Sequence, residues 1–184
     1  MLQFNFNPFP ELFTERLSLR QITHDDVNEI FFLRADEQVM QYIDRPRAAM
    51  IEDANRFIEM VNDATFNNTD VTWGICTKND NRVIGYLGFW RIKPDHHRAE
   101  IGYALHPDWH RKGVASEAVK AVLDYGFTVM NLHSVEACVN PANNASIRLL
   151  ERHGFVREAY FKEDYYYNGR FLDSAIYSLI TPYP

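Results

Sequence analysis

The most informative stretch for predicting the fold is H-R-K-G-V-A-S-E-A, which runs from His110 to Ala118. It follows an apolar run from Glu100 to Leu105, and it precedes a run whose small and apolar side chains recur with the period of a helix. The residues on that helical face are Ala115, Ala118, Val119, Val122 and Gly126. This order predicts a strand, a short loop, and a helix that begins at Gly113.

The start of this helix has the chemistry of an anion-binding site. The first N–H groups of a helix have no intrahelical acceptor, and they lie at the positive end of the helix dipole. Gly113 lets the backbone approach a ligand closely, and Arg111 and Lys112 add two positive charges beside it. We therefore predict an anion-binding turn, and the alternative is an ordinary solvated basic loop.

The rest of the chain is predicted to form strands and helices around this unit. The strands are expected at residues 17–22, 71–77, 83–92, 100–105, 134–139, 155–167 and 170–180. The helices are expected at residues 27–36, 51–66, 114–130 and 144–153. Tyr42 to Met50 is expected to be a loop, Asn143 to cap the last helix, Gly154 to end it, and Asn168-Gly169 to form a hairpin turn.

These elements predict a mixed α/β fold with seven strands and about four helices. The strands at 100–105 and 134–139 are joined through a helix, so we expect them to be parallel within a sheet that is otherwise mostly antiparallel. No linker or repeat divides the chain. We therefore expect an N-terminal arm at residues 1–13 and a single domain at residues 14–184.

Charge and cysteine content exclude several classes of protein. The net charge of -6 argues against a general nucleic-acid-binding protein, whereas an acidic surface suits a cationic amine. Cys76 and Cys138 fall in separate predicted strands, so we expect two buried free thiols and a reducing compartment. There is no metal-ligand spacing, no signal peptide and no apolar run of membrane-spanning length. We expect a cytoplasmic protein without a bound metal or a membrane span.

Five segments together resemble the GNAT acetyltransferase superfamily. H-R-K-G-V-A at 110–115 is similar to the Q/R-x-x-G-x-G/A signature of that family, although His110 replaces Gln or Arg. The flanking E-I-G-Y-A-L-H-P-D-W and A-S-E-A resemble the branch that contains the ribosomal-protein N-terminal acetyltransferases of the Rim type. Residues 140–146, Gly154-Phe155 and Tyr166 to Arg170 match the same branch in type and spacing. The resemblance covers residues 14–180 and implies a GNAT fold with a splayed central pair of parallel strands.

The resemblance also implies acetyl-CoA as the cosubstrate and assigns residues to it. The diphosphate is expected at the turn formed by His110, Arg111, Lys112, Gly113, Val114, Ala115 and Ser116. The pantetheine arm is expected along the backbone of Tyr103, Ala104 and Leu105, like an added strand, and Asn143 is expected to bond the cofactor. A backbone N–H near Leu105 is expected to stabilise the oxyanion of the tetrahedral intermediate.

Transfer to an amine requires a base and an acid. Glu100 is the first candidate for the base, because it precedes the expected acetyl-binding backbone; the alternative is that Glu100 lies on a solvated face and pairs with Arg98 or a neighbour. Glu136, or water, is the reserve base. Many family members have Tyr at the position of Leu150, so Ser146 is the candidate acid; the alternative is that the Ser146 hydroxyl bonds its own helix backbone.

The predicted function is N-acetyl transfer from acetyl-CoA by direct attack of a primary amine in a ternary complex. A protein N-terminus and a small molecule (a polyamine, an amino acid or an antibiotic) are the two acceptor classes. A CoA-binding regulatory domain without turnover is the alternative of another kind, because Leu150 cannot protonate a thiolate. Nucleotide-binding signatures such as G-x-x-x-x-G-K-[ST] are absent, and a homodimer is compatible with this branch.

Overall fold

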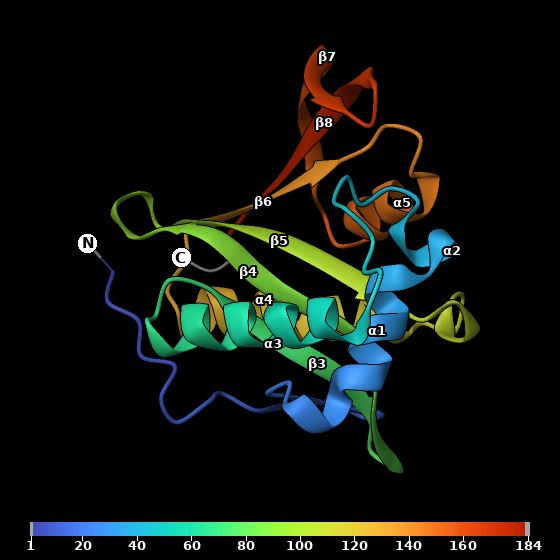
Figure 1. Ribbon diagram of the computed structural model, residues 1–184. Coiled ribbons are helices and arrows are strands. Elements are labelled where there is room, and N and C mark those ends of the chain that lie inside the picture. The colour runs from blue at the N-terminus through green and yellow to red at the C-terminus, as the bar shows by residue number, and fades with distance from the viewer. Residues whose placement is uncertain (1, 183–184) are drawn as a thin grey trace.

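A single eight-stranded sheet forms the centre of the computed structural model, which describes residues 2–182 (Figure 1). In spatial order the strands are β1 (Leu12–Phe13), β2 (Leu17–Arg20), β3 (Val71–Thr77), β4 (Asp80–Lys93), β5 (Arg98–Leu105), β6 (Ser134–Val139), β8 (Arg170–Ile180) and β7 (Val156–Tyr167). Within the described residues, β5 and β6 form the parallel pair, and every other neighbouring pair is antiparallel. The predicted mixed α/β fold with one parallel pair is confirmed.

Helices cover both faces of the sheet (Figure 1). They are α1 (Val27–Ala35), α2 (Glu37–Met40), α3 (Ile51–Phe66), α4 (Val114–Thr128) and α5 (Asn144–Arg152). Side chains of α1 and α3 share one buried cluster with one face of the sheet, and side chains of α4 and α5 share the second cluster with the other face. No helix within residues 2–182 is both long enough and apolar enough to cross a membrane.

Two short elements were not predicted from the sequence. Helix α2 follows α1 after the single residue Asp36, whose side chain accepts a hydrogen bond from Val39 N at 2.9 Å and caps the new helix. Strand β1 lies inside the predicted arm and pairs with β2, so the sheet has eight strands rather than seven. Both elements are too short for hydrophobic periodicity to reveal them.

The described part of the arm packs closely against the domain. The Phe6 side chain is 3% exposed, and the Trp73 indole Nε1–H donates to the carbonyl of Pro10 at 2.6 Å. Phe9 meets the Trp73 ring edge-on. The predicted arm starts at residue 1 and the predicted domain extends to residue 184, but residues 1, 183 and 184 lie outside the described residues.

The parallel strands β5 and β6 stay together for only three residue pairs, which run from Arg98↔Ser134 to Glu100↔Glu136. Beyond that point β5 remains paired with β4 as far as Leu105, and β6 remains paired with β8 as far as Val139. Each strand therefore follows its antiparallel neighbour, and the sheet opens between them, as Figure 1 shows. This divergence leaves one backbone edge of β5 unpaired after Glu100 within the described residues.

The last two strands form a hairpin that projects from the body of the molecule (Figure 1). Asn168 and Gly169 both have positive φ angles, of 47° and 81°, as a two-residue hairpin turn of this kind requires. The predicted turn is confirmed. Aromatic side chains on the hairpin remain exposed, namely Tyr160, Phe161, Tyr166 and Phe171.

Helix α4 packs closely against the sheet at Gly126. A Cβ atom at this position would lie 2.6 Å from Cζ of Phe89 on β4. Helix propensity alone favours alanine over glycine by about 1 kcal/mol, but the collision is expected to outweigh it. We predict that Gly126→Ala lowers the free energy of unfolding by about 1–3 kcal/mol, measured by urea titration.

A double-mutant cycle tests the cause of this loss. Phe89→Leu removes the ring that a Cβ at Gly126 would meet, so adding Gly126→Ala to that variant should cost much less than it costs the wild-type protein. Stabilisation by Gly126→Ala in the wild-type background would contradict the predicted close packing.

Candidate active site

The predicted helix start at Gly113 is present. Gly113 caps α4 in the left-handed conformation with φ 79°, and Arg111 also has a positive φ of 59°. The Glu117 N–H donates to the Gly113 carbonyl at 3.0 Å, which is the first hydrogen bond of the helix. The N–H groups of Val114 to Ser116 come before it and have no acceptor within the helix. The turn therefore presents a set of backbone donors at the positive end of a 15-residue helix.

A network from the first strands holds this turn in place. The Arg16 guanidinium donates to Glu117 Oε2 at 2.7 Å and to the Lys112 carbonyl at 3.0 Å, while the Arg16 backbone N–H and the Thr14 hydroxyl both donate to Glu117 Oε1. Burial raises the pKa of Glu117, but the hydrogen bonds from Thr14 and Arg16 lower it by more, so the pKa is lower than that of an ordinary glutamate. This role could not be predicted from the sequence, because Arg16 and Glu117 are 101 residues apart.

The polar side chains of the turn have specific partners. The His110 imidazole Nε2 lies 3.0 Å from the Leu105 carbonyl, so His110 ties the turn to the end of β5. Lys112 Nζ lies 5.2 Å from the centre of the Trp109 ring, a cation–π distance. Ser116 Oγ lies 2.9 Å from Nε2 of His153. The pKa of His153 is lowered, first by burial and then by the charges of Arg152 and Lys120.

The backbone predicted to receive the pantetheine arm lies along the opening. Residues Tyr103 to Leu105 pair with β4 on one side, and within residues 2–182 they have no strand partner on the side of β6. An unpaired strand edge offers N–H and C=O groups to an extended ligand. This edge ends at Leu105, whose carbonyl is contacted by His110 of the helix turn at 3.0 Å.

A pair of hydroxyl groups joins the two sides of the opening. The Tyr103 phenol of β5 lies 2.6 Å from Ser146 Oγ in the first turn of α5. The predicted cap is present, because Asn143 Oδ1 accepts from the Ser146 backbone N–H at 3.1 Å. Ser146 is 8% exposed, and burial raises the pKa of Tyr103 to about 12 although the Ser146 hydrogen bond lowers it slightly. The partner of the Ser146 hydroxyl is thus Tyr103 rather than its own backbone.

Leu150, at the position where many GNAT members have Tyr, is 0% exposed. It belongs to the buried cluster under α4. A buried leucine packed in this way supplies apolar contacts and no proton. The hydroxyl groups of Tyr103 and Ser146 are therefore the ones that lie together at this part of the opening. Their spacing along the sequence does not predict that Tyr103 contacts Ser146.

The two candidate bases are held differently. Glu100 has a side chain that is 18% exposed and pairs with Arg91 Nη1 at 2.7 Å, and the Arg91 side chain is itself 64% exposed. Glu136 accepts from Arg98 at 2.9 and 3.0 Å, and Lys93 lies 3.7 Å away. The alternative prediction named Arg98 or a neighbour as the partner of Glu100; Arg98 is bonded to Glu136, and Arg91 is the neighbour that pairs with Glu100. Glu100 is the less firmly held carboxylate of the two.

The face of the sheet that carries Glu100 is acidic beyond the divergence. The pKa of the Cys138 thiol on β6 is raised by partial desolvation and then by the negative charges of Glu100 and Asp164. The Tyr165 hydroxyl on β7 donates to Oδ2 of Asp44, in the loop after α2. Three carboxylates are thus gathered around the opening on this face, where they favour a cation.

The prediction of two buried thiols is correct for Cys76 and wrong for Cys138. Cys76 lies in the buried centre of β3, whereas Cys138 is exposed. The cause is the divergence: Cys138 lies two residues past Glu136, where β5 no longer covers that side of β6.

Comparisons with known proteins agree with this geometry. Residues 16–156 match the model of the acetyltransferase (GNAT) domain family. The uncharacterized N-acetyltransferase YoaA of Bacillus subtilis (strain 168) is 36% identical over 174 residues, which cover 95% of this chain and 98% of the relative. The crystal structure of spermidine N-acetyltransferase from Vibrio cholerae in complex with CoA and spermine has a TM-score of 0.80 and 26% identity, covering 91% of this chain and 96% of that one.

A further likeness concerns the fold alone. The crystal structure of ribosomal-protein-S5-alanine acetyltransferase from Vibrio fischeri has a TM-score of 0.82 at 24% identity, covering 95% of this chain and 98% of that one. The same arrangement of strands and helices therefore extends over nearly the whole chain.

The Glu117 network gives a prediction about stability and pH. Because the folded-state pKa of Glu117 is lowered, its carboxylate stabilises the fold above the unfolded-state pKa of about 4.3, and the effect is lost as the pH falls through the folded-state pKa. We predict that Glu117→Gln lowers the free energy of unfolding by about 1 kcal/mol at neutral pH, after allowance for the exposed Arg16 partner.

Urea titrations at several pH values check this expectation. The difference between wild type and Glu117→Gln should shrink as the pH falls below about 4.3. Glu151→Gln, on the exposed side of α5, is the matched control and should change little at any pH. A Glu117→Gln effect that is independent of pH would contradict a role for the charge.

Proposed function

Because this chain belongs to the GNAT acetyltransferase family, we propose that it transfers the acetyl group of acetyl-CoA to a primary amine by direct attack in a ternary complex. The observation that carries the proposal is the open edge of β5 that ends at the N-terminus of α4. An extended thioester fits an open strand edge, and a diphosphate fits the helix start. The two features meet at the contact between His110 and Leu105.

The chain's own residues fit a CoA-type cosubstrate. The backbone from Tyr103 to Leu105 would hold the pantetheine arm, and the turn from His110 to Ser116 would hold the diphosphate with the charges of Arg111 and Lys112 nearby. Asn143, whose amide oxygen caps α5, would bring its remaining amide hydrogens to the same opening. A backbone N–H near Leu105 would stabilise the negative charge on the carbonyl oxygen during attack.

Ser146 is the proposed donor to the leaving sulfur. Only one of two paired hydroxyls can donate across their hydrogen bond. With a pKa of about 12, Tyr103 stays protonated at neutral pH, and its phenol is the more acidic donor of the two. Donation from Tyr103 to Ser146 Oγ leaves the Ser146 hydrogen free to face the leaving thiolate. In this proposal Tyr103 orients Ser146, and Ser146 supplies the donor that Leu150 lacks.

Glu100 is the proposed base, acting on the amine directly or through a water molecule. The attacking nitrogen forms a bond to the acetyl carbon, the carbon–sulfur bond breaks, and the extra proton on nitrogen passes to the carboxylate. Glu100 is favoured over Glu136 because its ion-pair partner Arg91 is largely exposed, whereas Glu136 is bonded to Arg98 and lies near Lys93. Water is the third candidate, and the kinetics of two glutamine variants distinguish the three.

The acceptor belongs to one of two classes. The carboxylates of Glu100, Asp44 and Asp164 favour a cationic acceptor, as a polyamine or an N-terminal amine is. A relative that acetylates spermidine, 26% identical over 156 residues, supports a small-molecule acceptor. The resemblance to the ribosomal-protein branch supports a protein N-terminus. We further expect the protein to act in the cytoplasm, since Cys76 and Cys138 are both free thiols.

Calorimetric titration with acetyl-CoA, followed by thiol release with polyamines, amino acids and N-terminal peptides, tests the proposal. We expect binding in the micromolar range and turnover on one acceptor class. Gly113→Glu, which places a carboxylate at the helix start and a side chain at a φ of 79°, should weaken acetyl-CoA binding at least about tenfold.

Unchanged affinity in Gly113→Glu would overturn the assignment of the helix start to the diphosphate. Binding without turnover on any acceptor would favour the CoA-binding regulatory domain. Absence of binding would reject the transferase altogether.

The base and the acid can be separated by kinetics. Glu100→Gln should lower kcat about 100-fold at neutral pH and remove the acidic limb of the pH–rate profile, with acetyl-CoA affinity unchanged. Ser146→Ala should lower kcat with acetyl-CoA, and the loss should be smaller with an acetyl donor whose leaving thiol is more acidic, because that thiolate needs less stabilisation.

Two conservative variants provide the controls. Glu136→Gln should retain the pH–rate profile; if it instead reproduces Glu100→Gln, the base is Glu136, and a wild-type profile in both variants assigns the proton to water. Tyr103→Phe keeps the ring but removes the donor to Ser146, so it should show the same dependence on the leaving thiol as Ser146→Ala.

A further inference from the structure

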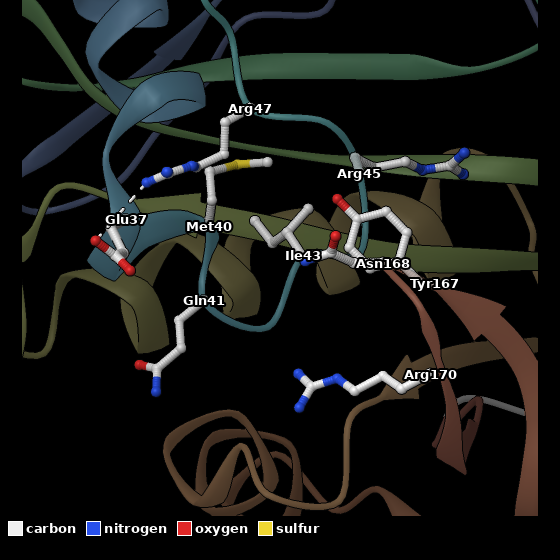
Figure 2. A pocket seen from close by; sticks show the side chains of 9 residues that line it. All are labelled: Glu37, Met40, Gln41, Ile43, Arg45, Arg47, Tyr167, Asn168 and Arg170. Carbon is white, nitrogen blue, oxygen red and sulfur yellow. Dashed lines mark ion pairs between the residues drawn. The ribbon is translucent and has the colours of Figure 1, made fainter.

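A cavity outside the proposed cosubstrate surface lies where the loop after α2 meets the tip of the β7–β8 hairpin. A cavity of about 300 Å³ is bordered there by Gln41, Arg45 and Arg47 from the loop and by Tyr167 and Arg170 from the hairpin. Figure 2 shows Arg170 extending from β8 into the space that Gln41 borders on its other side. Two segments far apart in the sequence thus bring three arginines to one opening.

The charge of this cavity is opposite to that of the protein as a whole. The residues that border the cavity include three arginines and one carboxylate, Glu37, which leaves an excess of two positive charges in a chain of net charge -6. Glu37 is 90% exposed and lies 3.9 Å from Arg47, at the outer limit of an ion pair. Within residues 2–182, the guanidinium groups of Arg45 and Arg170 have no hydrogen-bond or ion-pair partner. Guanidinium groups without partners are ready to bind carboxylates.

The cavity lies on the same side of the sheet as Glu100. The residue before Arg45 is Asp44, which accepts from the Tyr165 hydroxyl two positions before Tyr167. The pKa of Tyr165 is raised by burial, by Asp44 and then by the nearby Cys138. The negative charge of Glu100 in turn raises the pKa of Cys138. The bond between Asp44 and Tyr165 therefore joins the loop that carries Arg45 to the hairpin that carries Arg170.

The separation of Glu100 and Arg170 along the sheet limits the kind of ligand that reaches both. Glu100 is level with Glu136, which pairs with Ser178 of β8, and Arg170 lies eight residues before Ser178. At about 3.3 Å per residue this is about 26 Å along the strand. A single amino acid is far too short to span it, whereas an extended peptide of about eight residues spans it.

We propose that the arginine cavity of Arg45, Arg47 and Arg170 binds acidic side chains of a peptide acceptor whose N-terminal amine reaches Glu100. This inference rests on the proposed transferase function and specifies its acceptor. The carboxylates near the reaction centre attract the amino end, and the arginines hold acidic residues about five to eight positions downstream. The opposite charges at the two ends of this span fix the direction in which the peptide lies.

Peptides of ten residues with one common N-terminal sequence test the proposal with the full-length protein. One peptide carries Glu at positions five to eight, a second carries Lys there, and a third ends after position three. We expect kcat/KM to be highest for the Glu peptide and lowest for the Lys peptide. Raising the salt concentration should reduce the preference, because the arginines are exposed.

Charge reversal identifies the residues responsible. Arg170→Glu and Arg45→Glu should each lower kcat/KM for the Glu peptide about fivefold, through KM, and should raise it for the Lys peptide. Arg157→Glu, an exposed arginine on the same hairpin outside the cavity, is the matched control and should leave the preference unchanged. Calorimetry of each peptide with the CoA-loaded protein gives the same ranking independently of turnover.

The outcomes separate this inference from the proposed function. Turnover that is equal on the Glu and Lys peptides, or that occurs on spermidine with no peptide accepted, overturns the arginine site and leaves the transferase intact. An Arg170→Glu effect on the KM for acetyl-CoA alone assigns the cavity to the cosubstrate and also overturns the proposal. Absence of turnover and of peptide binding with every acceptor overturns both.

Discussion

The guanidinium of Arg98 ties three strands together at the point where the sheet is about to open. From β5 it donates to Ser134 and Glu136 of β6 and to Ser178 of β8, at distances between 2.9 and 3.0 Å. A planar group with five donors can bond several acceptors at once, which lysine cannot do in the same geometry. Within two residues of this cluster the parallel pairing ends, so the opening has a firmly held closed end.

The two faces of the sheet present different chemical groups at the opening. On the face with α4, the helix start, the open edge of β5 and the Tyr103–Ser146 pair suit an anionic thioester. On the opposite face, Glu100 and Asp44 suit an amine, and the arginines lie further out on the hairpin. A protein with an overall negative charge can bind an anionic cosubstrate because helix dipoles and backbone N–H groups act locally.

Several parts of this arrangement could be predicted from short-range patterns. The helix start at Gly113, the cap at Asn143 and the turn at Asn168-Gly169 each depend on the conformational preferences of a few adjacent residues. Gly154, with a φ of 86°, ends α5 for the same reason. The exposure of Cys138 could not be predicted, because it depends on where a neighbouring strand departs rather than on the pattern of β6 itself.

The order of the main strands and helices, the parallel central pair and the helix start at Gly113 could all be predicted from the sequence. These features depend on periodicity, on caps and turns, and on the rule that a helical crossover joins parallel strands. The long-range partners could be seen only in the folded protein: Arg16 with Glu117, Tyr103 with Ser146, Arg98 with Glu136, and the arginines of two distant segments around one cavity. These partners are tens of positions apart along the chain. A hydrogen bond or ion pair between such residues can form only after the register of the strands has brought them together.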